Sequence, residues 1–336
     1  MVWTIIEGIA GVLLALATLR DLFDTVVVPG RTRGVLQVSR RLVRTALPLA
    51  RRSRGRGIGA NFAPIVLGGA FVIWMVLLVL GFGLIVHALS DSFEPPLKSF
   101  GHALYVAGGA MATIGFGSSE ARGWAASAVV IGGFCGLAAM TMAVTYLLEI
   151  QSNTAHRDVG VLKITTTAGQ PPSSLALFER YAALGSRDHM AALLREGRDW
   201  CAIVLQSHST HPWLVYFRSV GTGSGWPAAL GALMDVSLIA EMLVDEPQLR
   251  GPGVLAREEG TRLCTEITKM LGLEPVHEPV TREIVDRLCA RLTAAGYKLR
   301  EDRDVGAFIA ARDMGAARVR ALARHLGTRE APLVPS

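Results

Sequence analysis

Two long stretches without a full charge constrain this chain most. Residues 57–86 contain no Asp, Glu, Lys or Arg over 30 positions, and residues 123–148 contain none over 26. An α-helix needs about 20 apolar residues to cross the hydrocarbon core of a bilayer. Both stretches are therefore predicted to be membrane-spanning helices. The composition of the whole chain agrees, because 51% of its residues are hydrophobic and only 18% are charged.

A third apolar stretch, at the start of the chain, is less uniform. Residues 2–28 are interrupted by Glu7 near one end and by Arg20 and Asp24 near the other. Arg20 and Asp24 are four residues apart, so their side chains can pair on one face of a helix. We predict an N-terminal transmembrane helix within residues 1–30. The alternative is an amphipathic helix that lies on the membrane surface.

A basic block separates the first two of these stretches. Nine of the 34 basic residues lie between Arg31 and Arg56, a segment without acidic residues. Short loops rich in Lys and Arg stay on the cytoplasmic side of a membrane, so residues 31–57 are predicted to be a cytoplasmic linker. The N-terminus then lies outside, and everything after Glu149 lies in the cytoplasm. We expect a multi-pass protein of the cell (plasma or inner) membrane and no nucleic-acid partner.

The stretch between the second and third helices, residues 90–122, is external at both ends and unusually apolar for an exposed loop. Non-helical backbone is tolerated at membrane depth only where protein buries it or where it lines a water-filled path. A re-entrant loop fits this stretch. Its most distinctive sequence is Thr113-Ile114-Gly115-Phe116-Gly117.

These five residues resemble the T-V-G-Y-G signature of the potassium-channel pore family, which includes bacterial two-helix-pore and two-pore-domain-like channels. The resemblance implies an all-α pore domain over residues 58–151, built as outer helix, pore helix within residues 97–112, filter and inner helix. It also implies a homotetramer with bound K⁺. The backbone carbonyls from Thr113 to Phe116 and the Thr113 hydroxyl would replace the water shell of the ion. Ile114 and Phe116 would pack against the pore helix.

The sequence departs from this family at several positions. Ala112 stands where many relatives have a second Thr, Ser118 stands where Asp is common, and Phe116 lacks the Tyr hydroxyl. Gly109 matches a position where some relatives carry a carboxyl group in the pore helix. These departures predict fewer hydrogen bonds behind the filter.

Two further positions have open alternatives. Glu120 is a candidate mouth charge that raises the local cation concentration, or it is an ordinary solvated loop residue. Gly136 lies where an inner-helix glycine acts as a gating hinge in the family. It can equally serve close packing between helices through small residues.

The rest of the chain reads as a helical cytoplasmic domain over residues 175–336, after a linker over residues 152–174. Helical spacing of apolar residues predicts amphipathic helices, of which the last two cover residues 280–295 and 304–326. Because no series of strands is visible, neither a Rossmann nucleotide-binding module nor a cyclic-nucleotide β-roll is expected.

Metal, phosphate-binding and catalytic sites are at most weakly indicated in this domain. His208, His211 and Asp235 are weak candidates for a metal or pH-sensing site, and structural histidines are the simpler interpretation. The four dispersed cysteines indicate neither a disulfide framework nor a zinc site. The glycine-rich residues 221–225 fit an inter-helix loop better than a phosphate cradle, since no P-loop Lys follows. No catalytic constellation stands out, so we expect no enzyme and no cofactor beyond K⁺.

The sequence therefore predicts a homotetrameric, potassium-selective channel, gated through its cytoplasmic helical domain by an unidentified regulatory ligand. One alternative is a non-conducting membrane receptor or sensor on a channel-like scaffold. Another is a cation-transporter subunit, although such proteins carry four filter-like loops in one chain and no internal repeat is visible here.

Overall fold

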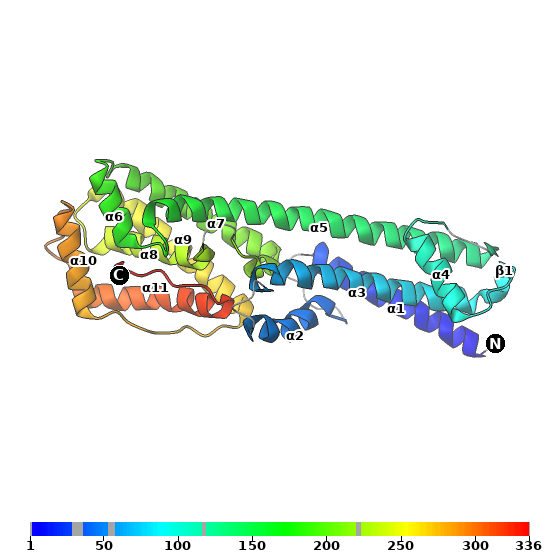
Figure 1. The fold of residues 1–336 in the computed structure, drawn as a ribbon. Coiled ribbons are helices and arrows are strands. Elements are labelled where there is room, and N and C mark those ends of the chain that lie inside the picture. Colours follow the sequence, from blue (N-terminus) through cyan, green and yellow to red (C-terminus); the bar gives the residue numbers. More distant parts are fainter. Residues whose placement is uncertain (1, 29–35, 53–57, 116–118, 220–222, 336) are drawn as a thin grey trace. The chain divides into compact units, whose positions relative to one another are not determined.

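The computed structural model of the protein describes residues 2–28, 36–52, 58–115, 119–219 and 223–335. Over these residues the chain is predominantly α-helical with almost no sheet, which confirms the all-α prediction (Figure 1). It divides into two compact units, Met1–Gln151 and Ser152–Ser336, and each is described by itself.

Among its described residues, the first unit contains four α-helices and the greater part of a fifth. The helices and strands that begin in it are α1 (Val2–Val26), α2 (Val38–Arg52), α3 (Ile58–Ala88), η1 (Ser90–Ser92), β1 (Phe93–Glu94), α4 (Phe100–Met111), β2 (Glu120–Ala121) and α5 (Trp124–Ala168). Three of them, α1, α3 and α5, are long and apolar enough to cross a membrane. The three predicted membrane helices are thus confirmed in length and composition.

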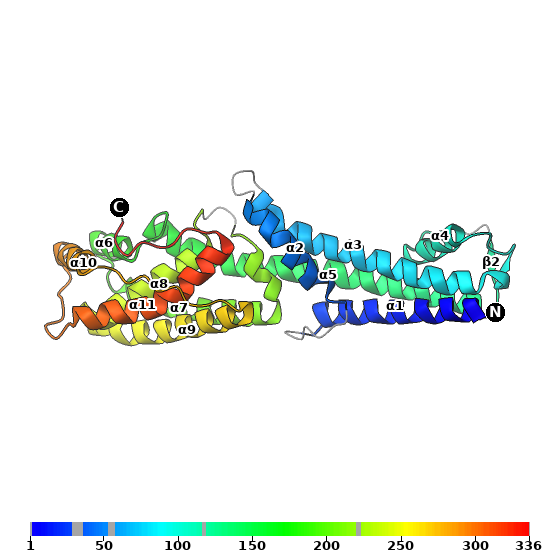
Figure 2. The ribbon, with the colours of Figure 1, turned by 90° about the horizontal axis from the view of Figure 1, so that it is seen from below.

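Helix α1 packs along α3, and small residues form the contact between the two helices (Figure 2). A Cβ atom on Gly11 would be 2.6 Å from the Gly81 carbonyl oxygen, and one on Gly81 would be 3.0 Å from the Ala15 nitrogen. Glycine and alanine at such a crossing let two backbones approach closely, which is how helices associate within a bilayer. The Glu7 carboxylate also lies 2.7 Å from His87 Nδ1 on α3. This packing along α3 favours the spanning interpretation of α1.

The other end of α1 is held by a buried carboxylate. Asp21 is 2% exposed and accepts hydrogen bonds from Trp74 Nε1 at 2.8 Å and from the backbone N–H groups of Gln37 and Val38 at 2.8 and 3.1 Å. Gln37 directly precedes α2 and Val38 is its first residue, so Asp21 caps the positive end of that helix. The predicted Arg20–Asp24 ion pair is present, at 3.7 Å.

Two predicted linkers are partly helical. The basic linker predicted over residues 31–57 contains α2, because Asp21, distant in sequence, binds its first N–H groups. Residues 152–168, predicted to begin a second linker, instead continue α5 to Ala168. Gly169, with φ +82°, and the following prolines end this helix, so only the last residues of that predicted linker are non-helical.

The second unit is an all-helical domain. After the end of α5 it contains α6 (Ser174–Ala183), α7 (His189–Thr210), η2 (Pro212–Tyr216), α8 (Gly225–Met242), α9 (Pro247–Leu271), α10 (Arg282–Ala294) and α11 (Val305–Leu326). Helix α8 is the most buried of these, and α7, α9 and α11 pack around it (Figures 1 and 2).

The predicted helices at the end of this domain are confirmed. Helix α10 falls within residues 280–295, and α11 begins and ends where its capping residues indicate. The Asp304 carboxylate accepts the N–H of Ala307 at 3.0 Å, and Gly327 closes the helix with φ +67°. Within the described residues the only strands are β1 and β2, so neither β-rich regulatory module is present there.

Candidate functional site

The predicted pore helix is formed by α4. Ser99 precedes it in an extended conformation, and its hydroxyl accepts the N–H of His102 at 3.3 Å. The helix ends at Met111, where Ala112 leaves the helical conformation. It is therefore slightly shorter at each end than the predicted range of residues 97–112. Its carboxyl-terminal end, which carries the negative end of the helix dipole, faces directly into the Thr-Ile-Gly sequence.

The residues after α4 turn their N–H groups back onto the helix. Thr113 N–H donates to the Ala110 carbonyl at 3.1 Å, and the N–H groups of Ile114 and Gly115 donate to the Gly109 carbonyl at 2.9 and 3.4 Å. Within the described part of the chain, no N–H group donates to the carbonyl oxygens of residues 113–115. The loop thus uses its donors internally and keeps its acceptors available, which is the arrangement that a cation site requires.

Two residues of this loop have left-handed backbone conformations. Gly115 has φ +70°, and Thr113 has φ +57°. Glycine adopts this conformation without steric cost, whereas a β-branched residue does so only when the surrounding structure enforces it. Strain of this kind is concentrated at functional sites. The hydrogen bonds to Ala110 and Gly109 hold the Thr113–Gly115 segment in this form.

The remaining predicted filter residues, Phe116 and Gly117, and the neighbouring Ser118 lie outside the described residues. Thr113, Ile114 and Gly115 are exposed in the single chain. The Ile114 side chain is 56% exposed, so one chain alone does not supply the packing against the pore helix that the sequence led us to expect.

Helix α4 is enclosed by glycines on its two neighbours. A Cβ on Gly83 of α3 would be 2.5 Å from Leu104 Cδ2, which shows how closely α3 and α4 approach. On α5, a Cβ on Gly133 would be 3.3 Å from the Ala110 carbonyl oxygen, and one on Gly136 would be 2.4 Å from that of Met111. Gly136 therefore serves close packing against α4. Helix α5 is continuous at this position, and a hinge there stays a prediction.

The two short strands that flank the loop carry charged residues. Strands β1 and β2 are antiparallel, with Glu94 opposite Glu120, and Glu94 forms an ion pair with Arg122. Glu120 is exposed and has no ion-pair partner among the described residues. Of the two carboxylates in this register, Glu120 is thus the one with uncompensated charge, as a mouth residue would need. Its role as a mouth charge stays a prediction.

The weak metal candidates of the second unit do not form a metal site. His208 Nδ1 lies 2.8 Å from the Val204 carbonyl oxygen, while Asp235 is bound by Arg312 through two contacts of 3.0 and 2.9 Å. No group of three His, Cys, Asp or Glu side chains within the described ranges, which include His211, is placed to hold a metal ion.

Burial also argues against pH sensing by His208. Desolvation, together with the nearby charge of Arg157, lowers the pKa of His208 to about 3, although its hydrogen bond to Val204 opposes this shift. The imidazole is therefore neutral throughout the physiological range.

The main structural support of the loop is not evident from the amino-acid sequence. Gly109 was noted for the side chain it lacks, yet its carbonyl oxygen accepts two of the three loop N–H groups. A backbone acceptor leaves no residue-specific signal, and only the position of this glycine near the end of the predicted helix pointed to it. The contacts of Gly83 and Gly133 with α4 were not predictable for a similar reason, because they depend on which residues of α4 face these glycines.

Comparison with known proteins agrees with this geometry. Residues 74–152 match the family model described as "Ion channel". The matched region begins within α3 and contains α4, the filter-like loop and the membrane part of α5. No curated protein and no solved structure matches the chain. The family match, the three apolar helices and the helical fold together identify residues 74–152 as an ion channel domain in a membrane protein.

Proposed function

We propose that this protein is a potassium-selective channel whose filter is built from the loop after α4. The observation that carries the proposal is the hydrogen bonding of residues 113–115, which uses all three N–H groups on α4 and keeps the carbonyl oxygens available. Potassium channels select their ion by replacing its hydration shell with rings of such carbonyls. The Thr113–Gly117 sequence supplies the residue types that this backbone requires.

A complete filter requires four chains. One chain contributes one loop, and a K⁺ ion in a carbonyl filter is surrounded by four such loops. The exposure of Thr113, Ile114 and Gly115 in a single chain supports this assembly, because these residues would be covered by neighbouring copies around a common axis. The apolar side chains of α5, such as Phe134 at 68% exposure, likewise require lipid or another chain.

The direction of the chain in the membrane follows from its arginines. Nine basic residues between Arg31 and Arg56 separate α1 from α3, and the tendency of such connections to stay in the cytoplasm supports a cytoplasmic position for this one. The N-terminus and the loop that contains Glu120 then face outward, and residues 152–336 lie in the cytoplasm.

We further propose that the second unit gates the pore through α5. This helix continues to Ala168, and its last part is bound firmly within the second unit. The Arg157 guanidinium donates to the carbonyl oxygens of Leu214 and Phe217 at 3.0 and 2.9 Å, and Trp200 Nε1 donates to the Arg157 carbonyl at 2.9 Å. A change in these helices would therefore act on the same helix that contains Gly136.

Flux measurements on purified protein in liposomes test the proposal. With K⁺ trapped inside, we expect K⁺ efflux that a Na⁺ gradient of the same size does not reproduce, together with a tetrameric mass in detergent. Equal K⁺ and Na⁺ flux would contradict potassium selectivity. A tetramer without any flux would favour the receptor alternative, and a flux coupled to a second ion would favour a transporter.

A further inference from the structure

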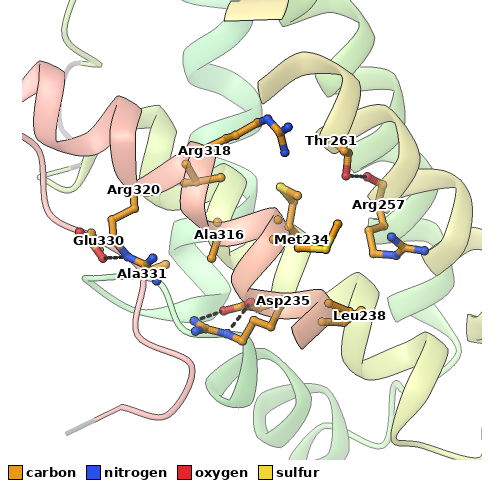
Figure 3. Close-up of a pocket in the computed structure, with 16 residues that line it drawn as sticks. Met234, Asp235, Leu238, Arg257, Thr261, Ala316, Arg318, Arg320, Glu330 and Ala331 are labelled. Atoms are coloured by element: carbon orange, nitrogen blue, oxygen red, sulfur yellow. Dashed lines mark hydrogen bonds and ion pairs between the residues drawn. The ribbon is translucent and has the colours of Figure 1, made fainter. Parts of the chain in front are cut away.

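The second unit contains a cleft that the channel function does not use. It lies between α8, α9 and α11 and has a volume of about 230 Å³ (Figure 3). The carboxyl-terminal segment after α11 closes one side with Glu330 and Ala331. All residues that line the cleft belong to the second unit, so its shape is independent of the pore.

The floor of the cleft is apolar. Met234 and Leu238 from α8 and Ala316 from α11 contribute to it. Small residues make the space: a Cβ on Gly315 would be 3.2 Å from the Met234 methyl group, and one on Gly231 would be 3.4 Å from Val319. Below the floor, the Sγ atom of the buried Cys264 lies 3.8 Å from the Met234 sulfur. An apolar group of a ligand would be desolvated here.

Four arginines line this cleft, and three of them are neutralised. Arg312 binds Asp235 through both carboxylate oxygens, at 3.0 and 2.9 Å. Arg257 binds Glu241, which lies outside the cleft, at 2.6 and 3.1 Å. The third, Arg320, lies 3.3 Å from Glu330 and donates to the backbone carbonyl oxygens of Val276 and Glu278.

Arg318 is the exception. Among the residues that the structure describes, no carboxylate lies within ion-pair distance of its guanidinium. Figure 3 shows its side chain extending from α11 across the cleft toward Thr261 on α9. Its charge extends to the buried Cys264 below the floor: burial raises the pKa of the Cys264 thiol to about 12, and Arg318 opposes part of that rise. An uncompensated, half-buried cation above an apolar floor is a recognition site for an anion with an apolar body.

We propose that this cleft binds a small organic carboxylate with an aromatic or short acyl body, whose carboxylate pairs with Arg318. The size of the cleft sets the size of the ligand. A cavity of about 150 Å³ holds benzene, so about 230 Å³ accommodates roughly nine non-hydrogen atoms. The two carboxylates of the lining, Asp235 and Glu330, already pair with Arg312 and Arg320. They therefore do not compete with the carboxylate of the ligand for Arg318.

Competition binding on the full-length protein in detergent tests this proposal. The probe is para-fluorobenzoate, followed by fluorine NMR, with empty micelles as the blank. We expect saturable binding that benzoate displaces. Benzyl alcohol has the same apolar body without the charge, and inorganic phosphate has charge without the body, so neither should displace the probe at the same concentration.

Variants assign the binding to this cleft. Arg318→Gln should weaken binding about ten- to a hundredfold, as expected for the loss of a charge-assisted hydrogen bond. Arg262→Gln removes an exposed arginine of α9 that does not line the cleft, and it should leave the affinity unchanged. Ala316→Phe fills the space above the floor and should abolish binding. If this variant does not fold, Arg318→Gln alone decides.

Several results would overturn the proposal. These are the absence of saturable binding to the wild type, equal affinity in Arg318→Gln, displacement by benzyl alcohol as effective as by benzoate, or displacement by phosphate. The measurement requires no flux. Its failure would therefore leave the channel proposal intact, and a protein that binds the probe but does not conduct would contradict only the channel proposal.

Discussion

Gly136 of α5 lies directly against Met111, the last residue of α4, and an ideal Cβ on Gly136 would be 2.4 Å from the Met111 carbonyl oxygen. The two carbonyls that hold the filter-like loop, at Gly109 and Ala110, belong to the same final turn of α4. The position of α5 therefore fixes the support of the loop. Any group added at Gly136 must move one of the two helices.

Gly136→Ala should destabilise the protein by about 1–3 kcal/mol, because the added methyl group overpacks the contact with Met111. The matched control is Gly68→Ala on α3, where nothing lies within 4 Å of the added Cβ. That substitution should be neutral or slightly stabilising, since Ala favours a helix over Gly by about 1 kcal/mol. The midpoint temperature of thermal unfolding in detergent compares the two variants. Equal midpoints would show that the close contact between Gly136 and Met111 does not contribute to stability.

Asp21→Asn should destabilise the first unit by about 1–3 kcal/mol. The amide replaces one acceptor oxygen by a donor that faces either the N–H of Gln37 or those of Trp74 and Val38, so at least one buried donor lacks its partner. Asp24→Asn in the same helix is the control, since its pair with the exposed Arg20 is worth less than about 0.5 kcal/mol. If both variants unfold alike, the buried carboxylate does not organise α1, α2 and α3.

The second unit should lose stability in mild acid through His208. Its pKa is about 3 in the folded protein against about 6.5 when unfolded, so protonation favours the unfolded state. The contribution of this group is constant above pH 6.5 and falls as the pH decreases toward 3. From pH 7 to pH 5 the loss is at most about 2 kcal/mol.

Denaturant unfolding followed by tryptophan fluorescence measures this dependence, since the ring of Trp226 lies 5.4 Å from that of His208. His208→Asn should remove the His208 part of the slope, because its amide can still donate to Val204 but does not titrate. His189→Asn, at an exposed position, should retain the slope. An unchanged slope in His208→Asn would mean that another group is responsible.

Gly160→Ala should change the open probability of the channel without changing its ion selectivity. The added Cβ would be 2.1 Å from Trp200 Cδ1, so the end of α5 must move against α7. Gly251→Ala in α9 is the control, since nothing lies within 4 Å of that position. Single-channel recording of both variants decides the matter. Gating identical to wild type in Gly160→Ala would indicate that the second unit does not act through α5.

The sequence predicted the membrane helices and most of the helical domain because long uncharged runs and helical spacing are local signals. The capping of α11 between Asp304 and Gly327 is of this kind, since both residues act on their own helix. The start of α2 was not predictable in the same way. It depends on Asp21, which lies sixteen residues before Gln37.

Within the candidate site, the filter-like sequence and the helix before it were visible in the sequence. The N–H groups that donate to Gly109 and the glycines that face α4 were not, because these contacts depend on backbone positions. The role proposed for Arg318 in the cleft could not be predicted from the sequence either. Its charge is equivalent to that of Arg312 in the sequence, and only the structure shows that Arg312, and not Arg318, pairs with a carboxylate of the described residues.

The most direct test of the central claim compares potassium flux in Gly115→Ala and Gly123→Ala. Both glycines have positive φ, +70° and +56°, and neither has an atom within 4 Å of an added Cβ. The two substitutions thus impose a similar backbone cost, but only Gly115 lies in the filter-like loop. We predict that Gly115→Ala abolishes potassium flux in liposomes while Gly123→Ala retains it, with both proteins assembled as tetramers. Potassium-selective flux at the wild-type rate in Gly115→Ala would contradict the assignment of this loop as the filter.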